Sequence, residues 1–191
     1  MPRRTTRPTP ASTSTLPETM KRVNYEFKAR LRDENPVRAA LKRLRARHIG
    51  NDRQIDTYFR VPRGRLKVRE GRIENALIFY ERSDSPRARR AQIEIMLLPR
   101  RNSLRSILAG GLGVLTVVDK RRQIYLVGNV KIHLDRVRGL GKFIEVEAIS
   151  RSGSVKKIRA QARKFQKLLA IPSSDILAKS YSDMVLKKSR R

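Results

Sequence analysis

Two glutamates stand two residues apart in the run Gly139–Glu147, which reads GLGKFIEVE. Because strand side chains alternate between faces, Glu145 and Glu147 point to one face, while Ile144 and Val146 point to the other. Carboxylate oxygens are the ligands that Mg²⁺ and Mn²⁺ prefer. The pair could therefore hold a metal ion, although two solvated glutamates on an exposed strand would show the same pattern.

The net charge of the chain indicates the kind of partner that the protein binds. The 191 residues include 46 Lys and Arg against 17 Asp and Glu, a formal net charge of +29. This excess implies a polyanionic partner, which could be a nucleotide, polyphosphate, nucleic acid or an anionic surface. The charge by itself does not choose among these partners.

Composition excludes several other kinds of site. The chain has no Cys, so it has neither disulfides nor thiolate metal ligands, and its two His argue against a His-built zinc site. No apolar run approaches the ~20 residues of a membrane span, and no signal-peptide core is present. We therefore expect a cytoplasmic protein that does not enter a membrane.

Charged residues also recur at a spacing of two in other strand-like segments. The pairs are Glu26 with Lys28, Lys67 with Arg69, Lys120 with Arg122, and Glu145 with Glu147. This spacing puts each pair on one strand face, opposite apolar neighbours. In a closed barrel one face must point inward. The charged faces would then line a polar tunnel, or would coat the outside of an ordinary barrel.

The elements that must position these residues are mostly strands. Alternation predicts strands over residues 23–31, 54–59, 65–69, 76–82, 92–98, 130–137 and 143–149, and a strand pair over 115–127. Helical periodicity predicts helices from Pro36, with Asn35 as N-cap, and over 103–112, 154–169 and 174–186. About eight strands joined by short turns predict an antiparallel α+β domain.

The two ends of the chain differ from this pattern in composition. Residues 1–20 are rich in Ser, Thr, Pro and Arg, and residues 188–191 are basic. We predict a disordered basic tail over 1–20, one domain over 21–187 and a basic tail over 188–191.

Several short motifs follow one another in a set order. They are YEFKAR at 25–30, QIDTYF at 54–59, LKVR at 66–69, YER at 80–82, KRRQIYLVG at 120–128, IHLDRVRGLGKFIEVE at 132–147 and SYSD at 180–183. This order resembles the CYTH, or triphosphate tunnel metalloenzyme, superfamily, and within it the class IV adenylyl cyclase-like branch. The resemblance runs from about Arg22 to Leu186.

The resemblance implies a closed eight-stranded antiparallel β-barrel with flanking helices, a triphosphate bound inside it, and Mg²⁺ or Mn²⁺ as cofactor. On matching positions the phosphate-binding residues would be Lys28, Lys67, Arg69, Arg82, Lys120 and Arg122. The metal ligands would be Glu26, Glu145 and Glu147, with Glu94 and Asp135 as secondary candidates. Lys28 and Arg122 are the residues expected to act in catalysis.

Two positions depart from the family pattern. Asn24 stands where the opening motif often has its first acid, which removes one ligand for a metal. Lys142 stands in the Gly-Leu-Gly-x-Phe turn where an acid is common, which argues against a second metal.

Three functions fit these observations. The first is a cyclase that converts ATP to cyclic AMP and pyrophosphate. The second is a hydrolase of inorganic or organic triphosphates in the same tunnel. The third is a non-catalytic tunnel protein that binds RNA or another polyanion, for which the acids inside would have no use. The expected partners are a nucleoside triphosphate or tripolyphosphate, with nonspecific nucleic acid on the basic surface, and the protein would be a monomer or homodimer.

Overall fold

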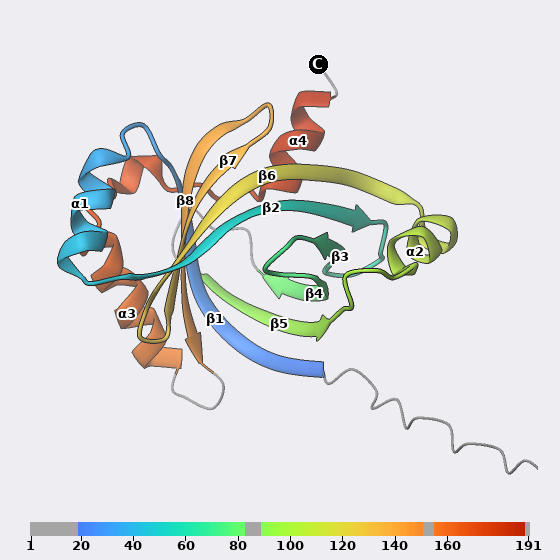
Figure 1. The fold of residues 1–191 in the computed structure, drawn as a ribbon, viewed down its shortest axis with the longest axis horizontal. Helices are drawn as coiled ribbons and strands as arrows, with labels where there is room; N and C mark the ends of the chain where they lie inside the picture. The colour runs from blue at the N-terminus through green and yellow to red at the C-terminus, as the bar shows by residue number, and fades with distance from the viewer. Residues whose placement is uncertain (1–18, 83–88, 151–154, 190–191) are drawn as a thin grey trace, which may run out of the picture.

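The computed structural model describes residues 19–82, 89–150 and 155–189, except the side chains of Arg82 and Arg89. Eight antiparallel strands close into a barrel in the order β1-β5-β4-β3-β2-β6-β7-β8 (Figure 1). The strands are β1 (Thr19–Arg30), β2 (Arg47–Phe59), β3 (Arg65–Glu70), β4 (Ala76–Arg82), β5 (Arg89–Leu97), β6 (Val114–Val127), β7 (Val130–Val137) and β8 (Gly141–Ser150). The predicted fold class is therefore confirmed.

Four α-helices accompany the barrel in the described residues: α1 (Asn35–Arg43), α2 (Leu104–Leu112), α3 (Val155–Leu168) and α4 (Tyr181–Ser189), with a 3₁₀ turn at Ser173–Asp175. Helices α1 and α3 lie on the same side of the barrel, whereas α2 stands at the far end of the β2–β6 ribbon (Figure 1). None of these helices combines the length and the apolar character needed to cross a bilayer.

The apolar faces of β1, β7 and β8 point outward, under α1 and α3. Burial of these faces drives the helices onto the barrel. The cluster includes Phe27, Ala29, Ile132, Ile144 and Val146 from the strands, Val37 and Leu41 from α1, and Ile158 and Phe165 from α3. With the apolar faces covered by helices, the alternating charged faces point into the barrel. The polar-tunnel alternative is the one that the structure adopts.

Strand register brings the charged pairs face to face inside. Lys28 is opposite Glu145 and Glu26 is opposite Glu147 across the β1–β8 pair. Residues opposite one another in neighbouring antiparallel strands project to the same face. The first row therefore places a base against an acid, and the second places two acids side by side.

The longest strands differ from the sequence-based prediction. β6 is one continuous strand rather than a strand pair, and β2 begins at Arg47 rather than at residue 54. These two strands pair along almost their whole length, with irregularities between His48 and Gly50 and between Tyr58 and Phe59. Backbone hydrogen bonds between β2 and β6 continue through segments in which apolar and polar side chains do not alternate regularly, so alternation alone predicted shorter strands.

The ends of other elements also differ from the prediction. β1 begins at Thr19, inside the predicted tail, while residues 1–18 and 190–191 lie outside the described part. Asn35 is the first residue of α1 rather than its N-cap, and its N–H donates to Asp33 Oδ1 at 2.9 Å. The final helical prediction separates into the 3₁₀ turn and α4.

Candidate active site

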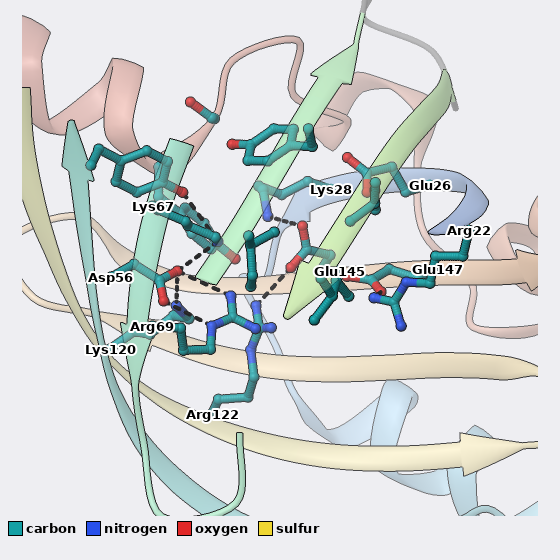
Figure 2. A pocket seen from close by; sticks show the side chains of 17 residues that line it. Arg22, Glu26, Lys28, Asp56, Lys67, Arg69, Lys120, Arg122, Glu145 and Glu147 are labelled. Carbon is teal, nitrogen blue, oxygen red and sulfur yellow. Dashed lines mark hydrogen bonds and ion pairs between the residues drawn. The ribbon is translucent and has the colours of Figure 1, made fainter. Parts of the chain in front are cut away.

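The barrel holds a cavity of about 80 Å³ whose walls are largely charged (Figure 2). Because strand side chains alternate, every second residue of the surrounding strands contributes to its wall. The charged residues that line it are Arg22, Glu26, Lys28, Asp56, Lys67, Arg69, Lys120, Arg122, Glu145 and Glu147. The cavity therefore gathers most of the predicted phosphate-binding and metal-binding residues.

One end of the cavity is a cation cluster built around Asp56 of β2. Asp56 Oδ2 accepts hydrogen bonds from Lys67 Nζ at 2.8 Å and from Lys120 Nζ at 2.6 Å. Arg69 donates to Asp56 through Nε at 2.8 Å and Nη2 at 3.0 Å (Figure 2). Three cations from β3 and β6 thus converge on one carboxylate.

Asp56 was not among the site residues predicted from the sequence. Its signal was present in QIDTYF, where the acid occupies an inward position in β2, opposite Arg69 of β3. Burial alone would raise the pKa of Asp56, but Arg69, Lys120 and Lys67 hold that pKa well below its ordinary value. Asp56 is therefore ionised and acts as an internal anion for the cluster.

Lys120 is the cation most affected by this environment. Burial, opposed by the nearby Asp56, lowers the pKa of its amino group from 10.5 to about 7. At pH values between about 7 and 10.5, Lys120 is protonated in the unfolded chain and neutral in the folded chain. Raising the pH through this range therefore stabilises the folded state.

We predict that Lys120→Met removes this part of the pH dependence. Urea unfolding of both proteins at about pH 7 and about pH 9.5 measures it. The stability of the wild type should rise with pH more than that of the variant. An equal change in both proteins would contradict the assignment.

A second network joins Lys28, Arg122 and Glu145. Lys28 Nζ donates to Glu145 Oε1 at 2.5 Å, and Arg122 Nη2 donates to Glu145 Oε2 at 2.7 Å. Arg122 also binds Asp135 through Nε at 2.7 Å and Nη2 at 2.6 Å, and the Tyr181 hydroxyl donates to Asp135 at 2.8 Å. Asp135, a secondary metal candidate, is thus a buried partner that orients Arg122.

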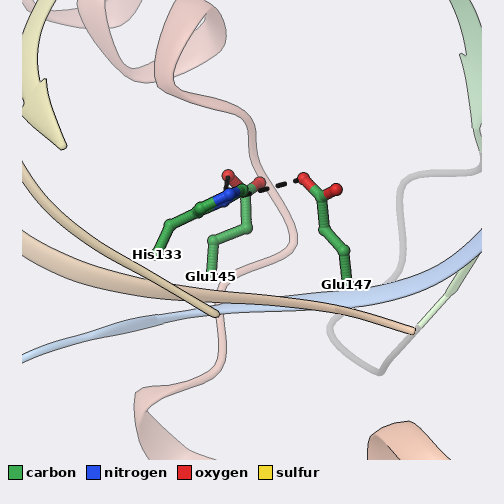
Figure 3. Close-up of side chains that lie close together, drawn as sticks. All are labelled: His133, Glu145 and Glu147. Carbon is green, nitrogen blue, oxygen red and sulfur yellow. Dashed lines mark ion pairs between the residues drawn. The ribbon is translucent and has the colours of Figure 1, made fainter. Parts of the chain in front are cut away.

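At the other end of the cavity, Glu145 and Glu147 lie beside His133, which is buried and does not itself line the cavity. One ligand atom from each lies within 4.8 Å of the others (Figure 3). His133 Nδ1 is 3.6 Å from Glu145 Oε2 and 3.8 Å from Glu147 Oε1. Both ring nitrogens of His133 are buried without a hydrogen-bond partner in the described residues.

The charge states of this group suit a divalent cation. Burial raises the pKa of both carboxyls, but nearby positive charge outweighs it. The pKa of Glu145 is lowered chiefly by Lys28, and that of Glu147 by His133 in its protonated form, so both carboxyls are ionised. Burial, together with Arg122, lowers the pKa of His133. A neutral imidazole with two open nitrogens beside two carboxylates is a donor set that binds divalent metals.

The remaining predicted residues lie in different places. Glu26 lines the cavity near Glu147, while Asn24 donates to Glu147 Oε2 at 3.2 Å and so positions this acid. Glu94 points out of the barrel, where it is 3.9 Å from Lys21, because Ile93 and Ile95 are the inward residues of β5. The side chain of Arg82 lies outside the described part.

One wall of the cavity is apolar. It is formed by Tyr58, Ile78, Tyr80, Ile93, Ile95 and Tyr181. The centroid of the Tyr181 ring is 5.1 Å from that of Phe143, with the two ring planes tilted by 59°, and 3.7 Å from Lys28 Nζ. Phosphate needs no apolar contact, so this wall can serve an organic group attached to it.

Comparisons with known proteins match most of the chain. The family model described as CYTH domain matches residues 22–181. A "Putative adenylate cyclase" of Methanocaldococcus jannaschii is 26% identical over 172 residues, which cover 85% of this chain and 98% of that protein.

Solved structures share the fold. The PH1012 protein of Pyrococcus horikoshii aligns with a TM-score of 0.71 and 24% identity over 84% of this chain and 98% of its own. A "putative adenylate cyclase" of Vibrio parahaemolyticus aligns with a TM-score of 0.68 and 20% identity over 85% of this chain and 97% of its own.

Proposed function

The chain belongs to the CYTH domain family, and from this premise we propose that it is a metal-dependent enzyme that processes a triphosphate inside the barrel. The reaction that we favour is that of a class IV adenylyl cyclase: ATP to cyclic AMP and pyrophosphate. The alternative is hydrolysis of an inorganic or organic triphosphate.

The observation that carries the proposal is the division of the cavity into two kinds of site. Lys67, Arg69 and Lys120 converge at one end, and Glu145 and Glu147, backed by His133, converge at the other. Lys28 and Arg122 lie between the two groups (Figure 2), and both bind Glu145. A triphosphate with a bound divalent metal has the charges that match this order.

Each group has a role in the proposed reaction. Lys67, Arg69 and Lys120 bind the end of the phosphate chain in place of the Asp56 carboxylate. Lys28 and Arg122 bind the oxygens of the reacting phosphate and offset charge that develops there. Glu145 and Glu147, with Glu26 and His133, hold Mg²⁺ or Mn²⁺, which when bound polarises the reacting phosphate.

The two reactions differ in which phosphorus is attacked. In the cyclase the ribose 3′-oxygen bonds to the α-phosphorus, the bond from that phosphorus to the bridging oxygen breaks, and pyrophosphate leaves as the hydroxyl proton is lost to solvent. In the hydrolase, water attacks the terminal phosphorus, the bond from that phosphorus to the bridging oxygen breaks, and orthophosphate and the shortened phosphate chain leave as a proton of the water is lost to solvent. The apolar wall favours a substrate with an organic group, whereas the cavity of about 80 Å³ suits tripolyphosphate.

Product analysis separates these reactions. Purified protein is incubated with ATP or with tripolyphosphate, each with Mg²⁺ or Mn²⁺, and the products are resolved by chromatography. Cyclic AMP with pyrophosphate establishes the cyclase, and orthophosphate from tripolyphosphate establishes the hydrolase. No turnover of either substrate would contradict both reactions and favour a non-catalytic binder.

His133 should influence which metal the site prefers. Imidazole binds Co²⁺ more favourably than Mg²⁺, which takes oxygen ligands. We expect His133→Gln to lower the affinity for Co²⁺ by about tenfold or more and to leave that for Mg²⁺ nearly unchanged. Calorimetric titration, with the visible absorption of Co²⁺, measures both. An equal loss for the two metals would contradict direct coordination by His133.

A further inference from the structure

A row of basic residues crosses the outer face of four neighbouring strands. Arg53 of β2 is opposite Arg121 of β6, Arg121 is opposite Arg136 of β7, and Arg136 is opposite Lys142 of β8. All four side chains are exposed. Directly opposite residues have Cβ atoms about 5 Å apart, and like charges in such positions destabilise a sheet. We call these four residues the cationic row.

Acidic neighbours form ion pairs with the two ends of the cationic row. Arg53 Nη2 is 3.0 Å from Asp119 Oδ2, and Lys142 Nζ is 2.9 Å from Glu34 Oε1. Arg121 and Arg136, in the middle, form no hydrogen bond or ion pair with any residue that the structure describes. The two central guanidinium groups therefore keep their donors for a ligand.

The cationic row lies in a groove beside the start of α1. The groove has a volume of about 680 Å³ and is lined by Arg53, Arg121 and Arg136 of the row. Its other charged lining residues are the bases Arg38, Arg72 and Arg122 and the acids Glu34, Asp52 and Asp135. Asn51 and Gln123 are opposite one another, two residues from Arg53 and Arg121 along the same strands. Their amide side chains also point outward and line the groove beside the cationic row. Arginine and amide side chains are the groups that bind the phosphate and sugar of nucleic acids.

Two aromatic rings continue the same face. His48 and Tyr125 are opposite one another in the β2–β6 pair, and their ring centroids are 4.8 Å apart. His48 is exposed, and the Tyr125 hydroxyl donates to Gln123 Oε1 at 3.0 Å. From Arg53 to His48 the strand spans about 16 Å, at about 3.3 Å per residue. Phosphate-binding and ring-stacking groups thus follow one another along β2 and β6.

We infer that this outer groove binds a single-stranded nucleic acid. Arg121 and Arg136 bind its phosphates. The exposed ring of His48, which lies beyond the lining of the groove against the half-buried Tyr125, offers a surface on which an unpaired base stacks. A duplex does not present its base faces, and a polyphosphate chain has no base, so the aromatic pair favours a single strand. This inference does not depend on the reaction in the barrel, because the proposed contacts do not line the inner cavity, whose one lining residue shared with the groove is Arg122.

Fluorescence anisotropy with a 5′-labelled oligouridylate of twelve nucleotides tests the inference. This probe has no triphosphate that could enter the barrel. We expect Arg121→Gln/Arg136→Gln to weaken binding about tenfold or more and to reduce the salt slope by about 1.4, the value for two lost contacts to a single strand. The matched control is Lys157→Gln/Arg163→Gln on α3, which removes two exposed charges outside the groove.

A third variant tests the stacking surface. His48→Ala should weaken oligouridylate binding about fivefold or more without changing the salt slope, because stacking involves no counterion release. Equal losses in the groove and control variants would show general charge attraction and overturn the inference. Tighter binding of inorganic polyphosphate than of the oligonucleotide, with no effect of His48→Ala, would also overturn it.

Stability distinguishes a binding site from a structural one. Since Arg121 and Arg136 repel each other, Arg121→Gln/Arg136→Gln should raise the thermal midpoint at low salt while weakening oligouridylate binding. A lower midpoint together with weaker binding would mean that the two arginines support the fold, and would contradict their role as ligand contacts.

Discussion

Glu145→Gln is expected to abolish turnover while leaving the protein able to bind tripolyphosphate. Glu145 is a member of the proposed metal group and also accepts hydrogen bonds from Lys28 and Arg122. Loss of a residue that only supports a metal ligand costs about 10- to 100-fold, so loss of a ligand itself should cost at least about 100-fold. The measurement is the rate of product formation from ATP or tripolyphosphate.

Binding of tripolyphosphate separates a chemical defect from a folding defect. Glu145→Gln removes a negative charge from the cavity, so calorimetry should show metal-free tripolyphosphate binding that is equal to or tighter than that of the wild type. Glu94→Gln is the matched control, because Glu94 lies outside the barrel. Loss of turnover in Glu94→Gln, or full turnover in Glu145→Gln, would contradict the proposed site.

Asp56→Asn should have the largest effect on stability. Asp56 is buried and is the shared partner of Lys67, Arg69 and Lys120. Removing one member of a buried ion pair typically costs about 3–5 kcal/mol, because it leaves uncompensated charge in the interior. We expect a loss of this size in the free energy of unfolding, measured with urea at neutral pH. Asp119→Asn, a matched control at a partly exposed pair with Arg53, should cost about 1 kcal/mol or less.

Tripolyphosphate should reverse much of this loss. In the wild type the phosphates must displace Asp56 from the three cations, whereas in Asp56→Asn the cations have no carboxylate to release. Ligand binding to the folded state raises stability in proportion to RT ln(1 + [L]/Kd), so tripolyphosphate should stabilise the variant more than the wild type. Equal stabilisation of both proteins would show that Asp56 does not occupy a phosphate position.

The acid pair, the paired cations and the barrel could be predicted from the sequence. Spacing of two in the strands places Glu145 with Glu147 and Lys120 with Arg122 on common faces, and this relation depends only on strand geometry. The order of the motifs predicted the family and the closed barrel. Most strands were predicted within a few residues of their observed ends, since their apolar and polar residues alternate clearly.

Only the tertiary structure decided what these faces meet. The choice between a polar tunnel and an ordinary barrel depended on α1 and α3 covering the apolar side, and such long-range packing has no signal in a single strand. The roles of Asp56 and His133 required register between strands that are distant in the chain, because Asp56 gathers cations from β3 and β6 and His133 of β7 meets two acids of β8. The outward direction of Glu94 likewise followed from which residues of β5 close the barrel. Local spacing therefore determined which residues share a face, and the closure of the sheet determined which of them meet across it.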